Sequence, residues 1–375
     1  MTRLIRLAAA LGVLLVATQL DVPRAPAKSR VQTVAKGLEV PWDIAFLPNR
    51  AGLVTERRGR VRLLKHNGKL RRKPVARIRV HALGEGGLLG IALDPRFRAN
   101  RLVYLYYTTR EGMRLGRWRW TGSRLRRQAT LLDDIAAGFV HDSGRIDFGP
   151  DGRLYVATGE AGEGELAQDP DSLNGKVLRL TPEQYHASEP VSPQILAMGL
   201  RNPQGFDWQP GSGTLVMNDH GPSGFDGPEG FDEVNVIVPG GNYGWPNAIG
   251  TDTGGGQYLA PVRLYPQPIA PSGAAFIGRR SAWRGDYVLA ALRGTELRRL
   301  EIHNGQVVAE DELLRNRFGR LRTVRQGPDG NLYVLTSNLD GRGFPRRGDD
   351  RILCLTPPRR EGHRPGRPRR GCLRG

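Results

Sequence analysis

Residues 148–160 read FGPDGRLYVATGE, a Gly-Pro-Asp-Gly turn followed by a short run rich in apolar residues. An Asp-Gly turn that leads into such a run is typical of a β-hairpin. A similar turn and apolar strand recur in five more stretches: FLPNRAGLVTE (46–56), LDPRFRANRLVYLYYT (93–108), WQPGSGTLVMND (208–219), WRGDYVLAAL (283–292) and GPDGNLYVLT (327–336). Long amphipathic helical patterns are nearly absent, so the chain is predicted to be all-β.

The six copies begin about 45 to 75 residues apart, which indicates a small sheet repeated about six times. We therefore predict a six-bladed β-propeller, because repeating the sheet around an axis leaves only short, protected sheet edges. Two stacked β-domains are the alternative, since the copies are only loosely similar. The tryptophans are expected to pack between blades rather than on a substrate, at Trp42, Trp208, Trp245 and Trp283.

The first 27 residues resemble a secretory signal peptide. Arg3 and Arg6 precede an apolar run over residues 7–18, and Ala25-Pro26-Ala27 resembles a cleavage site. The run is short for a membrane span. We therefore expect export to the periplasm or the medium, with no integral membrane domain after cleavage near Lys28. An uncleaved, lipid-inserted anchor is the alternative.

The propeller is expected to occupy residues 28–356. Residues 357–375 are rich in Pro, Gly and Arg, a composition that buries little apolar surface, so we expect a flexible basic tail. Two cysteines provide no disulfide framework, but Cys354 and Cys372 could pair in an oxidising compartment and tether this tail.

The 375 residues carry a formal net charge of +19, almost all of it from arginine. Such a charge would suit nucleic acid or an anionic surface. The arginines are scattered singly, however, and no nucleic-acid-binding motif surrounds them. We therefore do not expect a nucleic-acid partner.

Residues 141–160, HDSGRIDFGPDGRLYVATGE, place a histidine before the best copy of the repeat and a glutamate after it. A histidine whose ring is held by a carboxylate is the usual base near neutral pH. His141 is therefore the predicted general base, and Glu160 the residue that orients it. A surface histidine without a catalytic role is the alternative.

Seven predicted loops carry further polar motifs. They are GEGGLLGIALDP (84–95), HDSGR (141–145), LRNPQG (200–205), DHGP (219–222) followed by DEVN (232–235), GGNYGWP (240–246), APSG (270–273) and RLRTVRQGPDG (320–330). In their content and order these motifs resemble the soluble glucose and sorbosone dehydrogenase family, especially the aldose sugar dehydrogenases that use pyrroloquinoline quinone (PQQ). The resemblance extends from about Gly37 to Thr356.

The resemblance implies a role for each matching position. His141 would take the proton of the sugar's anomeric hydroxyl while hydride passes to the quinone, with Glu160 orienting the imidazole. Arg201 and Asn202 would lie against the cofactor and its reactive carbonyl, with Arg201 acting as the electrostatic partner of the reduced quinone.

Three more arginines would contact the cofactor. Arg320 and Arg322 match the family's pair for the cofactor carboxylates, and Arg293 replaces another basic residue that meets the cofactor. This set is chemically reasonable, because a tricarboxylated quinone is a multiply charged anion that guanidinium groups bind through paired hydrogen bonds. Any of these arginines could instead have a purely structural role.

The resemblance also implies Ca²⁺. The backbone carbonyls of Gly221 and Pro222 would hold the ion that bridges protein and quinone. Glu233 and the carbonyl of Tyr243 would hold a second, structural ion. Oxygen ligands in a short span suit this hard cation.

The chain departs from the family pattern at several positions. Glu85 stands where members often have Gln, which would place a carboxylate beside the cofactor and the sugar and could weaken quinone binding. Asp142 follows the base where Asn or Gln is often seen, Val140 precedes it where glucose-specific enzymes carry an acid, and PQPI (266–269) lacks a tryptophan that packs over the cofactor. These departures argue against narrow glucose specificity.

The small-molecule substrate is therefore predicted to be an aldose or a related polyol, and the electron acceptor in the periplasm is not identified. One alternative is a Ca²⁺-dependent propeller lactonase, which would need a metal-bound water and a carboxylate-rich channel but no quinone. The other is a non-catalytic propeller that binds sugars or anions through its basic face.

Overall fold

The computed structural model describes residues 29–278, 281–358 and Cys372. The predicted signal peptide (1–27) and most of the predicted tail (357–375) lie outside the described residues. In the described part of the chain, none of the helices is long and apolar enough to cross a membrane.

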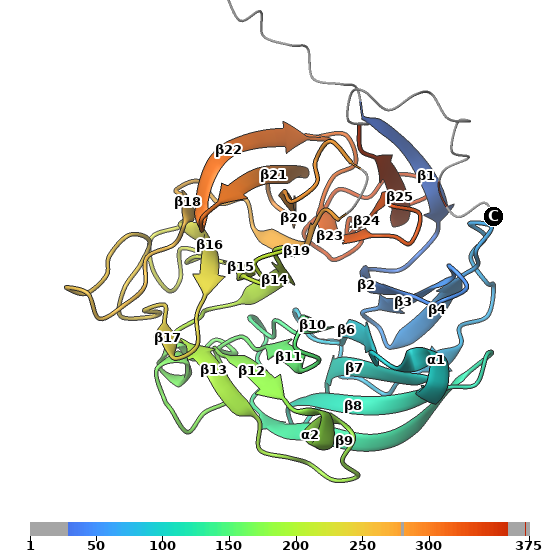
Figure 1. Ribbon diagram of the computed structural model, residues 1–375, viewed down its shortest axis with the longest axis horizontal. Helices are drawn as coiled ribbons and strands as arrows, with labels where there is room; N and C mark the ends of the chain where they lie inside the picture. The colour runs from blue at the N-terminus through green and yellow to red at the C-terminus, as the bar shows by residue number, and fades with distance from the viewer. Residues whose placement is uncertain (1–28, 279–280, 359–371, 373–375) are drawn as a thin grey trace, which may run out of the picture.

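Six sheets surround a central axis and confirm the predicted six-bladed propeller (Figure 1). Blade 1 contains β2 (Pro41–Phe46), β3 (Gly52–Glu56), β4 (Arg60–Leu64) and β5 (Ala76–Arg77). Blade 2 contains β6 (Leu88–Leu93), β7 (Leu102–Thr108), β8 (Met113–Trp120) and β9 (Leu125–Ile135). Blade 3 contains β10 (Ile146–Phe148), β11 (Leu154–Ala157), β12 (Val177–Leu180), β13 (Gln194–Met198) and the short β17 (Gly241–Asn242).

The other three blades follow the same plan. Blade 4 contains β14 (Pro203–Trp208), β15 (Leu215–Asp219), β16 (Asp232–Ile237) and β18 (Arg263–Tyr265). Blade 5 contains β19 (Pro271–Phe276), β20 (Tyr287–Ala291), β21 (Glu296–His303) and β22 (Gln306–Leu313). Blade 6 contains β23 (Leu321–Gln326), β24 (Leu332–Thr336), β25 (Arg351–Thr356) and β1 (Arg30–Lys36). Three single-turn helices complete the described elements: α1 (Phe97–Asn100), η1 (Gly164–Ala167) and α2 (Pro182–Tyr185).

The first and last strands close the ring. β1 pairs antiparallel with β25, in register from Arg30 opposite Thr356 to Lys36 opposite Arg351. In Figure 1 the blue β1 lies beside the dark red β25. Blade 6 is therefore built from both ends of the propeller, so the ladder between them holds the circle closed.

Each copy of the sequence repeat forms the second strand of a blade. The six apolar runs become β3, β7, β11, β15, β20 and β24, and the preceding turn connects each to the innermost strand of its blade. The repeat therefore marks one equivalent place in every blade. The short α1 within the second copy was not predicted.

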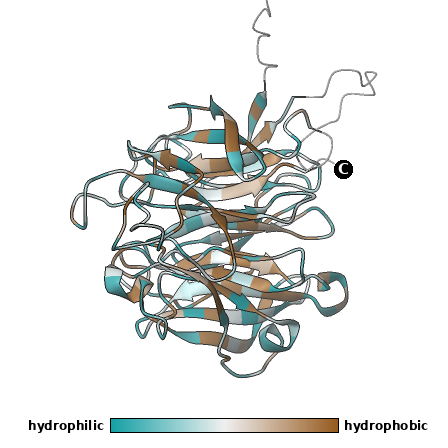
Figure 2. Cartoon of the chain, turned by 60° about the vertical axis from the view of Figure 1, so that its left-hand side comes forward, coloured by the Kyte–Doolittle hydropathy of each residue, from teal (hydrophilic) through white to brown (hydrophobic). Residues whose placement is uncertain are grey.

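The hydrophobic core is divided among the blade interfaces. Six buried clusters are present, one between each pair of neighbouring blades; Leu53 and Val103, for example, meet between blades 1 and 2. Figure 2 shows the brown, hydrophobic segments on the strands of the stacked blades. Trp42, Trp208 and Trp283 belong to or pack against these clusters, as predicted, whereas the ring of Trp245 lies under the guanidinium of Arg201 at 5.2 Å.

Cys354 and Cys372 form a disulfide, which confirms that the two cysteines pair. Cys354 lies in β25, and the backbone N–H of Cys372 donates a hydrogen bond of 3.1 Å to Asp329 Oδ2. The disulfide therefore ties one point of the C-terminal segment to blade 6.

Arg145 fills the centre of the propeller. Its Nη1 lies 2.7 Å from Asp43 Oδ2, and its Nε donates to the carbonyl oxygen of Gln204 at 3.0 Å. Its Nη2 donates to Thr323 Oγ1 at 3.0 Å, and the guanidinium carbon lies 4.3 Å from the ring centroid of Trp42. One fully buried side chain thus joins blades 1, 3, 4 and 6 across the axis.

Replacing Asp43 with Ala is expected to destabilise the protein by about 3–5 kcal/mol, because it leaves the fully buried Arg145 guanidinium without its carboxylate. Both Arg145 and Arg325 contact Asp43. Denaturant unfolding of Asp43→Ala against the wild type would measure the loss. The control is Arg153→Ala, which breaks a partly exposed pair with Asp151 and should change stability by about 1 kcal/mol or less. Equal stability of the two variants would contradict the central role of Asp43.

Candidate active site

A cavity of about 260 Å³ lies at the end of the propeller where the innermost strands begin. We call it the larger cavity. Its wall contains seven of the residues predicted from the sequence: Glu85, His141, Gly221, Pro222, Arg293, Arg320 and Arg322. Loops of five different blades contribute these residues, so the fold brings together motifs that lie far apart in the chain.

Irregular pairing shapes the wall. The register shifts at the start of the innermost strands β2, β14 and β23. In each of them one residue has no partner in the second strand of the blade; these residues are Trp42, Gln204 and Arg322. All three residues line the larger cavity. A bulge bends a strand and re-aims its extra residue, so these shifts account for the side chains at this end. The β-propensity patterns of the sequence did not predict them.

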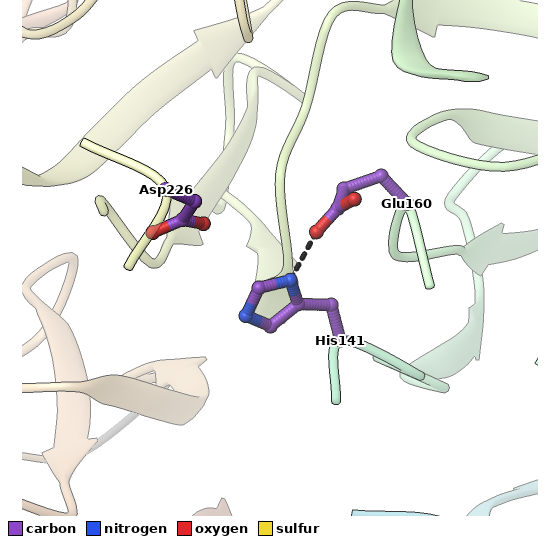
Figure 3. A group of neighbouring side chains, drawn as sticks. All are labelled: His141, Glu160 and Asp226. Atoms are coloured by element: carbon purple, nitrogen blue, oxygen red, sulfur yellow. Dashed lines mark hydrogen bonds and ion pairs between the residues drawn. The ribbon is translucent and has the colours of Figure 1, made fainter. Parts of the chain in front are cut away.

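His141 and Glu160 are brought together as predicted. Nδ1 of His141 and Oε1 of Glu160 form a short hydrogen bond, and both residues are buried (Figure 3). A carboxylate accepts this bond, so Nδ1 carries the proton and Nε2 holds the free lone pair. Figure 3 shows Nε2 on the side of the ring away from Glu160. His141 lines the larger cavity and can receive a proton there.

The turn that carries His141 has an uncommon backbone. His141 and Ser143 have φ values of 62° and 50°, in the left-handed region that side chains other than glycine rarely adopt. The turn is held by hydrogen bonds from Ser143 N to Asn202 Oδ1 (3.2 Å) and from Ser143 Oγ to the Ala157 carbonyl (3.1 Å). At Gly159 an added Cβ would lie 1.8 Å from the His141 carbonyl oxygen, so only glycine fits behind the histidine.

Glu85, the unusual acid of the first loop, accepts three hydrogen bonds. The donors are His141 N (2.9 Å), Arg342 Nη1 (2.7 Å) and Asn202 Nδ2 (3.4 Å). Burial raises the pKa of Glu85, but the charge of Arg342 and the backbone hydrogen bond from His141 outweigh burial and lower it to about 2. The ion pair with Arg342 compensates the extra negative charge. Sequence analysis missed Arg342, which lies 257 positions away in the chain.

Arg201 does not line the larger cavity. Its Nε and Nη2 lie 2.7 and 2.6 Å from Asp226 Oδ2, and its side chain is almost fully buried. Polar atoms of Asp226, His141 and Glu160 lie within 4.8 Å of one another (Figure 3). Asp226 was not predicted, because its loop has no motif that distinguishes it from any other Gly- and Pro-rich turn.

Two of the predicted cofactor arginines already have carboxylate partners. Arg293 forms a close, largely exposed ion pair with Glu229, and Arg320 Nε donates to Asp340 Oδ2 at 2.8 Å. Both guanidinium groups nevertheless line the larger cavity.

Arg322 differs from these arginines. Its Nη1 donates to Gln204 Oε1 at 2.9 Å and lies 3.4 Å from Ser272 Oγ, while its buried Nε has no hydrogen-bond partner. No carboxylate pairs with it among the described residues. Burial lowers the pKa of Arg322 to about 9. A buried cation bonded only to neutral groups is well placed to bind an anion.

A smaller cavity, of about 20 Å³, adjoins the first and shares Gly221 and Pro222 with it. Glu233, Tyr243 and Asp219 also line this smaller cavity. Burial raises the pKa of Glu233 to about 8, and the nearby Asp219 adds to that shift. A site of this size holds about one small ion or water, and crowded carboxylates favour a hard cation. The lining of this cavity therefore fits one such ion, whereas two separate ions were predicted at Gly221 with Pro222 and at Glu233 with Tyr243.

His220 is a further member of the larger cavity that sequence analysis quoted within DHGP but did not identify. Its Nε2 donates to the Pro271 carbonyl at 2.7 Å, and burial lowers the pKa of His220 to about 3. The ring is thus a neutral, fixed part of the wall.

The burial of Asp142 makes the unfolding free energy of the protein depend on pH. It accepts hydrogen bonds from Thr108 Oγ1 (3.0 Å) and Gly138 N (2.9 Å), yet burial raises its pKa to about 7, and the negative charge of Glu85 contributes. The ordinary value in an unfolded chain is about 3.9. The folded state therefore binds this proton more tightly, so the associated stability is present below about pH 4 and lost as the pH rises through 7.

Relative to Asp142→Asn, the wild type is expected to lose roughly 3–4 kcal/mol of unfolding free energy between about pH 4 and pH 8. Denaturant unfolding of both proteins across that range would measure this loss. Subtracting the unfolding free energy of the variant from that of the wild type at each pH removes the contributions of the other titrating groups. Parallel curves for the two proteins would show that Asp142 does not titrate in this range.

Comparison with known proteins agrees with this geometry. A family model described as Glucose / Sorbosone dehydrogenase matches residues 38–346. The aldose sugar dehydrogenase YliI of Escherichia coli strain K12 is 32% identical over 350 residues, covering 84% of this chain and 92% of YliI. The PQQ-bound structure of an aldose sugar dehydrogenase from Streptomyces coelicolor has 38% identity and a TM-score of 0.78, covering 88% of this chain and 98% of that one. The family match and the near-complete overlap with YliI show that the chain belongs to the glucose/sorbosone dehydrogenase family of oxidoreductases.

Proposed function

We propose that the chain oxidises an aldose or a related polyol with PQQ as the hydride acceptor and Ca²⁺ as its anchor. The observation that carries this proposal is that His141, held by Glu160, lines the same cavity as the buried guanidinium of Arg322, which has no carboxylate partner among the described residues. His141 would accept a proton from the substrate, and Arg322 would bind an anionic cofactor. The PQQ-bound relative from Streptomyces coelicolor supports the choice of cofactor.

His141 would act as the general base. Because Nδ1 donates to Glu160, Nε2 is free to accept the proton of a sugar hydroxyl. Glu160 holds the ring in this tautomer and stabilises the positive charge that develops on it. The strained but well-anchored backbone at His141 fixes the ring against the cavity.

Arg322 and Arg320 would bind cofactor carboxylates, and Gly221 with Pro222 would supply carbonyl oxygens to Ca²⁺. The quinone supplies the site that accepts hydride, a reaction that no amino-acid side chain performs. The protein contributes position, a base and compensating charge. Arg201, paired with Asp226 behind the His141–Glu160 pair, would add positive potential at a distance.

The lactonase alternative fits the channel poorly. Such an enzyme needs a carboxylate-rich metal site at the propeller axis, whereas Asp43 at this axis is paired with Arg145 and Arg325. The Asp43 carboxylate is thus committed to guanidinium groups. This arrangement favours the oxidoreductase over the hydrolase.

Export remains part of the proposal. The Cys354–Cys372 disulfide supports it, because such bonds persist mainly in oxidising compartments. The electron acceptor would then be a periplasmic or extracellular molecule.

The direct test is a titration of the cofactor-free protein with PQQ and Ca²⁺, followed by a panel of aldoses and an artificial electron acceptor. We expect Ca²⁺-dependent binding and sugar-driven bleaching of the cofactor absorbance. Failure to bind PQQ with and without Ca²⁺ would overturn the proposal.

Replacing His141 with Ala is expected to lower kcat by about 100-fold or more, because the base is lost, while PQQ binding stays nearly unchanged. Steady-state kinetics with a saturating aldose would measure the loss. The exposed His66→Ala is the matched control and should behave as the wild type. Normal turnover of His141→Ala would exclude His141 as the base.

Replacing Arg322 with Met is expected to weaken PQQ binding by about tenfold or more, because one charge-assisted contact to a carboxylate is lost. Unfolding of the cofactor-free variant should be no easier than that of the wild type, since the buried charge pairs with no carboxylate in the described part of the chain. Equilibrium binding and denaturant unfolding separate the two effects. Arg98→Met, at an exposed position of α1, is the control. Unchanged PQQ affinity in Arg322→Met would refute the assigned contact.

A further inference from the structure

Phe225 is an exposed aromatic residue in the wall of the larger cavity. It lies on the loop between β15 and β16 and leaves 67% of its surface accessible. Its ring centroid lies 6.0 Å from that of His141, and the two planes differ by only 15°. Such values describe offset, parallel rings. The phenyl ring thus extends the surface of the base on the cavity side.

The loop holds this ring in place. The next residue, Asp226, is anchored in the interior through Arg201, and its Oδ1 accepts the N–H of Ser223 at 2.9 Å. The base of the loop is closed by a hydrogen bond of 3.0 Å from Gly230 N to the Pro222 carbonyl. These bonds hold the backbone that carries Phe225, while its side chain is exposed beside His141.

Other exposed aromatic residues lack this setting. Phe139 and Phe344 are 64% and 91% exposed, but neither lines the larger cavity. The polar wall of that cavity offers charges and hydrogen-bond donors for hydroxyl and carboxylate groups. Phe225 adds what a sugar also needs, an apolar surface for the C–H face of its ring, and the negative face of an aromatic ring attracts such C–H groups.

We propose that Phe225 is the platform on which the sugar ring stacks, so that the hydroxyl to be oxidised reaches Nε2 of His141. The inference rests on the proposed function and names its substrate class. It favours pyranoses whose C–H bonds gather on one face over open-chain polyols, which present no such face. Phe225 is a specificity-determining residue and takes no part in proton transfer.

The test is direct sugar binding to the cofactor-free protein, observed by saturation-transfer NMR from aromatic protons to sugar protons. The probes are D-glucose, D-galactose, D-xylose and D-mannose, with sorbitol as the open-chain comparison. At least one aldose should receive saturation on its ring C–H protons. Its affinity should fall about tenfold in Phe225→Ala and be retained in Phe225→Trp and in the control Phe344→Ala.

Kinetics of the reconstituted enzyme give an independent readout. Phe225→Ala should raise KM about tenfold and change kcat by less than about threefold, with an unchanged pH profile, because the base is intact. Equal aldose affinity of the wild type and Phe225→Ala, or no binding of any of the four aldoses, would overturn the platform. Sugar binding without any PQQ-dependent oxidation would overturn the proposed function and leave the platform standing.

Discussion

The guanidinium of Arg145 at the propeller axis is the interaction on which the rest of the site depends. It contacts Asp43, Gln204 and Thr323 and stacks on Trp42, so one side chain fixes four blades relative to one another. Arg145 also ends the segment that begins with His141. Arg145 therefore anchors the strained turn that carries His141, the proposed base. A planar cation with five donors suits this place, since it can satisfy several acceptors at once.

Charge compensation explains how so basic a chain builds an ordered site. Of the arginines that line the larger cavity, Arg293, Arg320 and Arg342 each pair with a carboxylate, and Arg322 does not. The pairing of Arg342 with Glu85 bears on the main departure from the family pattern. An acid in place of glutamine adds a negative charge near the expected cofactor, and a guanidinium 2.7 Å away cancels it. Because Arg342 compensates the charge of Glu85, we expect little weakening of quinone binding from this acid.

Features that depend on local sequence patterns could be predicted from the sequence. Turn-and-strand repeats located the second strand of every blade, and the spacing from His141 to Glu160 across one hairpin identified a pair that the fold joins. Contacts between loops of different blades could not be predicted in this way. Asp226 next to Arg201 and Arg342 next to Glu85 depend on how blades are arranged around the axis, and nothing in their local sequence marks them. The bulge that turns Arg322 inward is likewise a property of strand pairing.

The loop between β15 and β16 shows why these long-range contacts matter for chemistry. Gly221 and Pro222 at its start border both cavities, and Asp226 further along holds Arg201 behind the His141–Glu160 pair. The carbonyls expected to bind a cation, the acid that pairs with Arg201 and the Phe225 ring beside His141 thus belong to one short segment. Its geometry is set at both ends by ordered strands and in the middle by the partly buried ion pair of Asp226 with Arg201. A change in the smaller cavity that moves Gly221 or Pro222 therefore shifts the wall of the larger one, because both residues line both cavities.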